Sequence, residues 1–294
     1  GVSSPNEPRW LQLLCLGLVV MRCQPLRRAL YLSSVKRIFM EKCKLCLKEK
    51  KLRNSHIIPD AFFQFIKKGN RNGRHIVISD EGNSWQQETC SEKMLCGECE
   101  HKFSSKFEKY AAELLLYNPS KIGATVKQFN GHVELSGIDY AKLKLFQMSL
   151  LWRASVSEQK FYKNVSLSSF DEELLRSRLN ELNPLLEHQF PCTFERVMND
   201  VLPSSSDRKN RKSGLASPKT TDIGYCKYIT FVLGGFSIRT YLHCNYPLPT
   251  KRLLKQTGSL ECHDIKIEHH EILSLVIKKQ AENINSNKCK VTSV

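Results

Sequence analysis

Residues 43–46 read Cys-Lys-Leu-Cys and residues 96–99 read Cys-Gly-Glu-Cys, so two Cys-x-x-Cys pairs flank a stretch of 49 intervening residues. Two residues between paired cysteines allow a tight turn that directs both sulfurs to one place. Two such turns complete a tetrahedral thiolate site for Zn²⁺. The sequence therefore predicts a structural zinc ion with four ligands, namely Cys43, Cys46, Cys96 and Cys99. The spacing is wider than in most zinc ribbons, so the segment between the pairs should form structure of its own.

Two other interpretations of the cysteine pairs are unrelated turns with free thiols and a redox-active pair. A thioredoxin-like redox site carries its Cys-x-x-Cys at the start of a helix that follows an apolar strand. Neither pair is expected in that setting, so the sequence favours zinc. Four thiolates also close the coordination sphere, which is typical of a structural zinc ion.

Two further motifs accompany the cysteines. Residues 55–59 read Ser-His-Ile-Ile-Pro, and residues 146–155 read Phe-Gln-Met-Ser-Leu-Leu-Trp-Arg-Ala-Ser. Together with the cysteine pairs, these motifs resemble the zinc-bearing branch of the HNH (ββα-metal) nucleases. They are similar to an uncharacterised, mostly microbial group that reads Cys-x-x-Cys…Ser-His-Ile-Ile-Pro…Leu-Cys-x-x-Cys-Glu. The resemblance covers roughly residues 41–180, and it implies an endonuclease that hydrolyses DNA phosphodiester bonds.

The resemblance implies specific roles for two residues. His56, directly before Ile-Ile-Pro, occupies the position of the general base, and Glu100, directly after the last cysteine, occupies that of a metal-binding histidine. Phosphodiester hydrolysis needs a base that activates water and a cation that stabilises the charge on phosphate. A carboxylate is a suitable ligand for Mg²⁺. We therefore expect His56 and Glu100 to be catalytic, with Mg²⁺ or Mn²⁺ as the cofactor.

Two positions depart from the family pattern. Ser55 stands where an Asp or His ligand is common, and Ser91 falls where the middle Asn is expected. Asn83 could replace that Asn only if its loop folds back. These departures leave open a catalytically inactive, zinc-dependent nucleic-acid-binding module, in which His56 is structural. A third interpretation is a protein-interaction module whose positive charge is incidental.

The chain is strongly basic, with 45 Lys and Arg residues against 29 Asp and Glu residues, a net charge of +16 and a pI near 9.3. Such an excess favours nucleic acid or an anionic membrane surface as partner, although a generally basic soluble protein would have the same composition. Combined with the motifs, it predicts DNA as the partner and no membrane. The sequence contains no P-loop, Gly-x-Gly-x-x-Gly or Gly-x-Ser-x-Gly motif, so we expect no small-molecule cofactor. The oligomeric state is left open.

The remaining cysteines and the first residues bear on the compartment. Eight of the twelve cysteines lie outside the pairs without a disulfide framework, which suits a reducing compartment, so we predict a cytoplasmic protein that is not secreted. Residues 10–21 form an apolar run shorter than the ~20 residues of a membrane-spanning helix. The charge flanking this run is wrong for a signal peptide. We expect residues 1–39 to be a non-native segment or a dispensable extension, and Met40 to be the natural start.

Residues 40–117 are predicted to form the zinc-binding HNH-like module. We expect strands at 55–58 and 75–79, a helix at 61–68, a polar loop at 80–90 and a helix at 102–117. This order places His56 on a strand and Glu100 at the start of a helix, which is the ββα arrangement.

Residues 118–201 are predicted to form a hairpin and helical region. Asn130-Gly131 suits a two-residue type I′ turn between two short strands. The wide apolar surface of residues 140–157 is typical of a buried helix. Acidic residues at the start of the segment 170–182 favour another helix there.

The last third of the chain is predicted to contain a loop and a small hairpin. Residues 202–224 read as a flexible basic loop, in which a cluster could contact the nucleic-acid backbone. That cluster comprises Arg208, Lys209, Arg211 and Lys212. A solvated loop is the other interpretation. Residues 225–294 are expected to form a hairpin (225–233 and 236–244), a strand at 265–267 and a C-terminal helix at 269–281. The predicted fold class is α+β: a zinc-stabilised ββα-metal module, a helical region, and a small β-hairpin-plus-helix portion.

Overall fold

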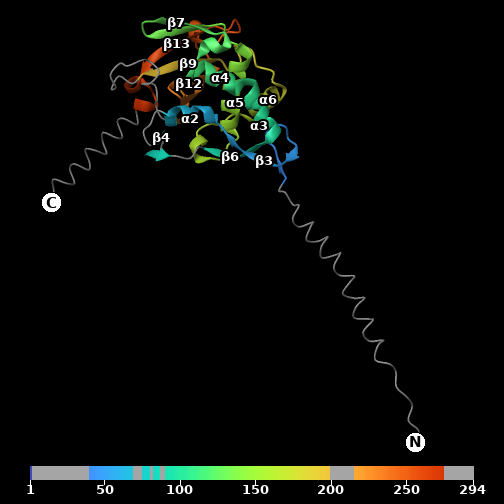
Figure 1. Ribbon diagram of the computed structural model, residues 1–294. Coiled ribbons are helices and arrows are strands. Elements are labelled where there is room, and N and C mark those ends of the chain that lie inside the picture. The colour runs from blue at the N-terminus through green and yellow to red at the C-terminus, as the bar shows by residue number, and fades with distance from the viewer. Residues whose placement is uncertain (2–39, 69–74, 80–81, 87–89, 199–214, 275–294) are drawn as a thin grey trace, which may run out of the picture.

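A computed structural model describes residues 1, 40–68, 75–79, 82–86, 90–198 and 215–274 (Figure 1). The predicted extension at 1–39, the basic cluster at 208–212 and the part of the C-terminal helix beyond 274 lie outside these residues, apart from Gly1. No helix in the described ranges is long and apolar enough to cross a membrane.

A nine-stranded sheet forms the main body, with the strand order β5-β4-β10-β11-β12-β9-β13-β8-β7. Neighbouring strands run antiparallel except at two places, β4 with β10 and β9 with β13. The strands are β4 (His75–Ser79), β5 (Gly82–Gln86), β7 (Thr125–Phe129), β8 (His132–Ser136), β9 (Cys192–Met198), β10 (Leu215–Asp222), β11 (Cys226–Leu233), β12 (Phe236–Cys244) and β13 (Leu260–Lys266).

Helices cover one face of this sheet (Figure 1). They are α2 (Asp60–Lys68), α3 (Gly97–Phe103), the π-helix η1 (Ser104–Glu108), α4 (Lys109–Leu116), α5 (Tyr140–Ser155) and α6 (Ser169–Glu181). Short 3-10 turns add η2 (Pro119–Ile122), η3 (Lys160–Tyr162), η4 (Thr250–Arg252) and η5 (Ile267–His269). Residues 143–154 of α5 are all buried, so the prediction of a buried helix is confirmed.

The ends of two helices follow local capping rules. Asp139 accepts the Lys142 N–H at the start of α5, and Ser168 accepts the Asp171 N–H at the start of α6. Such caps satisfy backbone donors that a helix leaves without intrahelical partners.

A separate strand pair lies at the edge of the body nearest the cysteines. β3 (Leu52–His56) pairs antiparallel with β6 (Ser91–Cys96), and α3 follows β6 directly. A second small pair joins β1 (Glu41–Lys42) to β2 (Glu49–Lys50). The same hydrophobic core runs from these elements through the helices to the sheet. The fold is therefore mixed α and β, as predicted.

The tip of the β11–β12 hairpin packs directly against the helices. Gly234 and Gly235 have φ values of 59° and 82°, which suit the two-residue turn that the Gly-Gly sequence predicts. A Cβ atom added to Gly234 would lie 2.6 Å from Cδ2 of Leu116 and 2.9 Å from Cδ1 of Phe62. Glycine therefore provides both the backbone conformation and the close approach of the sheet to α2 and α4.

Two predicted loops contain strands. Residues 215–222, which belong to the predicted basic loop, form β10 in the interior of the sheet, and residues 82–86 of the predicted polar loop form β5. The hairpin at 225–244 is consequently part of the large sheet, because β11 and β12 continue the sheet from β10. Local composition indicated loops, but pairing with neighbouring strands decides the structure at both places.

Other boundaries also differ from the prediction. The helix expected from residue 102 begins at Gly97, and the strand expected at 265–267 begins at Leu260. The hairpin at Asn130-Gly131 is confirmed by the pairing of β7 with β8. However, its turn is not type I′, because only Gly131 has a positive φ (78°) and type I′ requires both residues to have one.

Cys226 and Cys244 form a disulfide between paired positions of β11 and β12. The prediction that the scattered cysteines lack disulfides is therefore wrong for this pair. The two cysteines are 18 positions apart in the sequence, and this spacing alone did not indicate a disulfide.

Candidate metal centre

The four predicted zinc ligands meet at one point. The sulfur atoms of Cys43, Cys46, Cys96 and Cys99 all lie within 4.8 Å of one another, and the Cys46 and Cys96 sulfurs are 4.0 Å apart. A tetrahedral zinc ion with Zn–S bonds of about 2.3 Å requires sulfur separations of about 3.8 Å. The four cysteines therefore have the donor type and the spacing to hold a metal such as zinc. In the described ranges, no other group of three or more Cys, His, Asp or Glu side chains could do so.

The turn that carries the first pair is shaped by its own backbone. The Leu47 N–H donates to the Cys43 carbonyl at 2.9 Å, and Leu47 has a φ of 60°. The Cys96 N–H donates to the Cys43 sulfur at 3.3 Å. This N–H···S contact links the turn to the end of β6, so the protein itself connects the two halves of the site without a metal ion.

The thiols also respond electrostatically to one another. The hydrogen bond from Cys99 is the largest cause that lowers the pKa of Cys43 to about 4. Donating that hydrogen bond raises the pKa of Cys99, and burial raises the pKa of Cys46. Several thiolates so close together repel one another without a cation between them. A bound divalent ion would remove that repulsion.

The second cysteine pair lies where a redox pair would lie, contrary to our expectation. Cys96 ends β6 and Cys99 lies in the first turn of α3, so this Cys-x-x-Cys does begin a helix after a strand. What separates it from a two-cysteine redox site is the pair Cys43 and Cys46, whose sulfurs complete the cluster.

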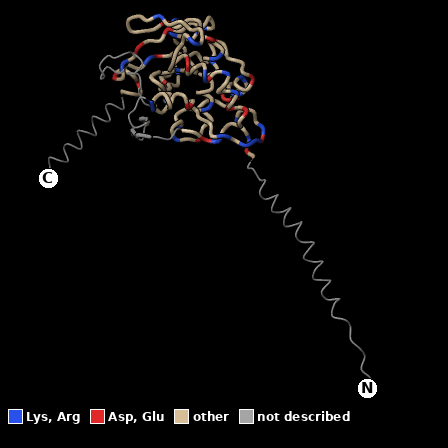
Figure 2. Tube along the Cα trace, viewed as in Figure 1, with Lys and Arg blue, Asp and Glu red and all other residues tan. Residues whose placement is uncertain are grey.

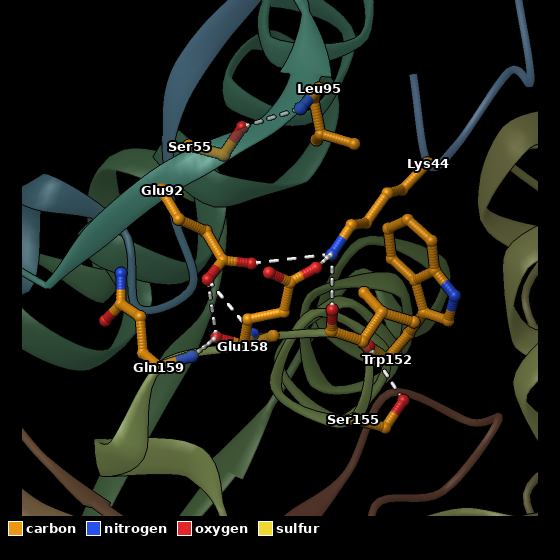
Figure 3. A network of polar contacts seen from close by, with 10 residues as sticks. Lys44, Ser55, Glu92, Leu95, Trp152, Ser155, Glu158 and Gln159 are labelled. Atoms are coloured by element: carbon orange, nitrogen blue, oxygen red, sulfur yellow. Dashed lines mark hydrogen bonds and ion pairs between the residues drawn. The ribbon is translucent and has the colours of Figure 1, made fainter. Parts of the chain in front are cut away.

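The turn at Cys43–Cys46 is anchored to two helices through its middle residues. Figure 3 shows Lys44 reaching the end of α5, where its Nζ donates to the Val156 carbonyl at 2.7 Å and lies 3.8 Å from Oε1 of Glu92. Glu92 in turn accepts from the Ser157 hydroxyl at 3.1 Å. On α6, Arg176 donates to the Leu45 carbonyl at 2.7 Å. The cluster is thus held rigidly against the helical layer.

His56 lies at the end of β3, opposite Ser91 of β6. It is half-buried, and burial lowers the pKa of its imidazole. A lowered pKa keeps the ring neutral at neutral pH, and only the neutral ring can accept a proton from water. The His56 carbonyl accepts a hydrogen bond from Arg153 at 2.5 Å.

Glu100 lies in α3 beside Ser55, and Ser55, one of the two departures from the family pattern, has a structural role. Ser55 is fully buried, and its hydroxyl accepts the Leu95 N–H at 3.0 Å (Figure 3). Burial raises the pKa of Glu100, an effect that the hydrogen bond with Ser55 partly offsets. The Oε1 atom of Glu100 is buried without a hydrogen-bond partner in the described part of the chain. A cation bound there would satisfy this oxygen.

The other candidates named from the sequence lie elsewhere. Asn83 is in β5, opposite Ile78 of β4, so its backbone belongs to the large sheet and not to the β3–β6 pair. His101, which directly follows Glu100 and is not among the predicted site residues, is exposed on α3. The four basic residues at 208–212 fall outside the described ranges.

Sequence reasoning did not identify two acidic residues beside the site. Glu92 holds the end of α5, and Glu108 pairs with Arg153 at 2.8 Å. The motif at residues 146–155 was the available signal, because it contains Arg153 and points to α5 as a partner of the site.

No protein-family model, curated protein or solved structure matches this chain significantly.

Proposed function

We propose that this chain is an HNH-type endonuclease that hydrolyses DNA phosphodiester bonds with Mg²⁺ or Mn²⁺, and that zinc on the four cysteines is structural. The observation that supports this proposal is the placement of two residues. His56 ends β3, and Glu100 lies in the first turn of α3, the helix that follows β6. Cys96 and Cys99 of the cysteine cluster lie at the junction of β6 and α3.

One feature of each residue supports its proposed role, and a bound cation would favour the ionised form of Glu100, whose pKa burial raises. His56 has a lowered pKa, so it can take a proton from the attacking water. Glu100 presents a buried carboxylate oxygen without a hydrogen-bond partner in the described ranges. Mg²⁺ is commonly held by one or two carboxylates together with water and substrate phosphate. Bound there, it would stabilise the negative charge that develops on the phosphate.

The charge of the chain supports a polyanionic substrate. The net charge is +16, and Figure 2 shows basic and acidic residues interspersed along the described trace. The positive excess includes the cluster at 208–212, which we propose as a contact for the DNA backbone.

A second candidate function is an inactive, zinc-dependent nucleic-acid-binding module. Ser55 favours it, because the buried hydroxyl already accepts the Leu95 N–H and a serine replaces a common metal ligand. This module would bind DNA in a salt-dependent way without cleaving it.

Plasmid cleavage by the full chain distinguishes these functions. The expected result is nicking that needs Mg²⁺ or Mn²⁺ and that falls by about 10²- to 10⁴-fold in His56→Ala, as loss of a general base predicts. His101→Ala is the matched control, because His101 is exposed on α3, and it should cleave like the wild type. Zinc content must be equal in all three proteins. Absence of cleavage by the zinc-loaded wild type, with DNA binding intact, would support the binding module instead.

A further inference from the structure

Arg153 is an almost completely buried charge, with 1% of its side chain exposed. It extends from α5 and contacts two other elements. Its Nη1 donates to the His56 carbonyl at 2.5 Å, and its Nη2 lies 2.8 Å from Oε1 of Glu108. On α5 itself, Nε donates to the Ser149 carbonyl at 3.3 Å and Nη2 to the Ser149 hydroxyl at 3.2 Å. One side chain therefore joins the end of β3, the π-helix η1 and α5.

The geometry explains why arginine occupies this position. A guanidinium is planar and carries five donors in a fixed fork, so it can bond several acceptors in different directions at once. Lysine offers a single nitrogen on a flexible stem. A buried ion pair is also weak evidence for stability alone, because apolar residues of similar volume often serve stability as well or better. The contacts of Arg153 are better explained by the elements that they hold in place.

The π-helix η1 determines which residue meets Arg153. Glu108 follows Glu100 by eight residues, and in a regular α-helix eight residues leave two side chains about 80° apart around the axis. The extra residue of a π-turn reduces that angle to about 20°. Because Glu108 is the last residue of η1, the π-turn brings it near the face that carries Glu100. The ion pair of Arg153 with Glu108 thus acts on the helix that carries Glu100.

We propose that Arg153 is a positioning residue that fixes His56 on β3 relative to Glu100 on the continuous helix α3–η1–α4. It acts through the His56 carbonyl on one side and through Glu108 on the other. Its role in catalysis rests on the proposed nuclease function, whereas its role in holding His56 does not. The same role accounts for two polar members of the motif at 146–155, since Ser149 orients Arg153 by both of its oxygens.

Gln147 provides a matched control on the same helix. It is as buried as Arg153, and its amide donates to the Thr240 hydroxyl of β12 at 2.9 Å. Replacing it with Met removes a buried hydrogen bond of α5 without touching β3 or η1. A variant at Gln147 therefore measures how much activity and stability are lost when any buried hydrogen bond of α5 is removed.

The test compares Arg153→Lys, Glu108→Gln and Gln147→Met in the full, zinc-loaded chain. We expect both Arg153→Lys and Glu108→Gln to lower kcat for DNA cleavage by about tenfold to about 100-fold with KM unchanged, as small misplacements in an active site do. Gln147→Met should keep kcat within about twofold of the wild type. The positioning role is overturned if Arg153→Lys keeps the wild-type kcat, or if Gln147→Met loses as much activity as the other two at a similar melting temperature.

A readout without cleavage separates this inference from the proposed function. With histidines labelled by ¹⁵N, the imidazole resonances of His56, assigned from His56→Ala, should shift or broaden in Arg153→Lys and stay unchanged in Gln147→Met. If the wild type does not cleave DNA, the nuclease proposal fails while this measurement still decides whether Arg153 holds His56. Unchanged His56 resonances in folded Arg153→Lys would refute the positioning role.

Discussion

The close approach of the β11–β12 turn to the helices allows a quantitative prediction. Gly234→Ala carries two penalties. The left-handed backbone (φ of 59°) costs an alanine about 1–2 kcal/mol. The new methyl group would overlap side chains of α4 and α2 at 2.6 and 2.9 Å, and overpacking of this kind costs about 1–3 kcal/mol. We therefore expect Gly234→Ala to lower the free energy of unfolding by about 2–5 kcal/mol.

Gly224→Ala isolates the backbone penalty. Gly224 has a φ of 81°, but a Cβ atom there would have no heavy atom within 4 Å. In this variant the free energy of unfolding should fall only by the cost of the left-handed backbone, about 1–2 kcal/mol. The effect of removing a glycine from the unfolded chain is common to both variants and cancels in their difference.

Urea unfolding of the zinc-loaded proteins, followed by tryptophan fluorescence, measures both losses. The difference between the two variants should be about 1–3 kcal/mol. Leu116→Ala should cost less stability in the Gly234→Ala background than in the wild type, because it removes the nearer overlapping side chain. Equal losses in Gly224→Ala and Gly234→Ala would refute the claim that the turn packs tightly on the helices.

Three more predictions concern the metal centre, a buried histidine and the disulfide. Elemental analysis should find about one zinc per chain, and Cys43→Ser should lose it, whereas Cys90→Ser, outside the cluster, should retain it. Burial lowers the pKa of His270 to about 4 in the folded protein, below the unfolded value near 6.5. His270 therefore resists protonation only when folded, and stability should fall as the pH drops from about 6.5 towards about 4, by about 3 kcal/mol in total. Urea unfolding at pH 7 and pH 5 should show a smaller pH effect in His270→Gln than in the wild type. Reduction of Cys226–Cys244, which closes an 18-residue separation, should cost about 3 kcal/mol by the same assay, and a Cys226→Ala protein should be insensitive to reductant.

The cysteine cluster could be predicted from sequence because its chemistry is local. Each Cys-x-x-Cys is a turn of four residues, and both pairs need only one common metal to come together. The strand that carries His56 follows from a short pattern of the same kind, whereas the helix that begins at Gly97 was expected only from residue 102. The coarse fold class and the buried α5 were accessible for this reason.

Features that depend on distant partners could not be predicted. β10 contains Ser217, Pro218 and Lys219, a composition typical of loops, and it is a strand because β4 and β11 flank it. Pro218 lies where the register between β10 and β11 shifts, which is a place where a strand tolerates proline. The contact of Arg153 with the His56 carbonyl joins residues 97 positions apart, and no local pattern reports such a separation.

The cysteine cluster has a consequence for the unfolded chain. Cys46 and Cys96 are 50 positions apart, so a metal ion that keeps its four sulfurs ties the intervening segment into a ring. Closing a ring of this length removes chain entropy worth about 4 kcal/mol from the unfolded state, as a disulfide would. The ring contains β4, which pairs with β10 in the large sheet. A bound metal ion would thus shorten the conformational search that brings β4 to the sheet. Loss of the ion would lengthen that search.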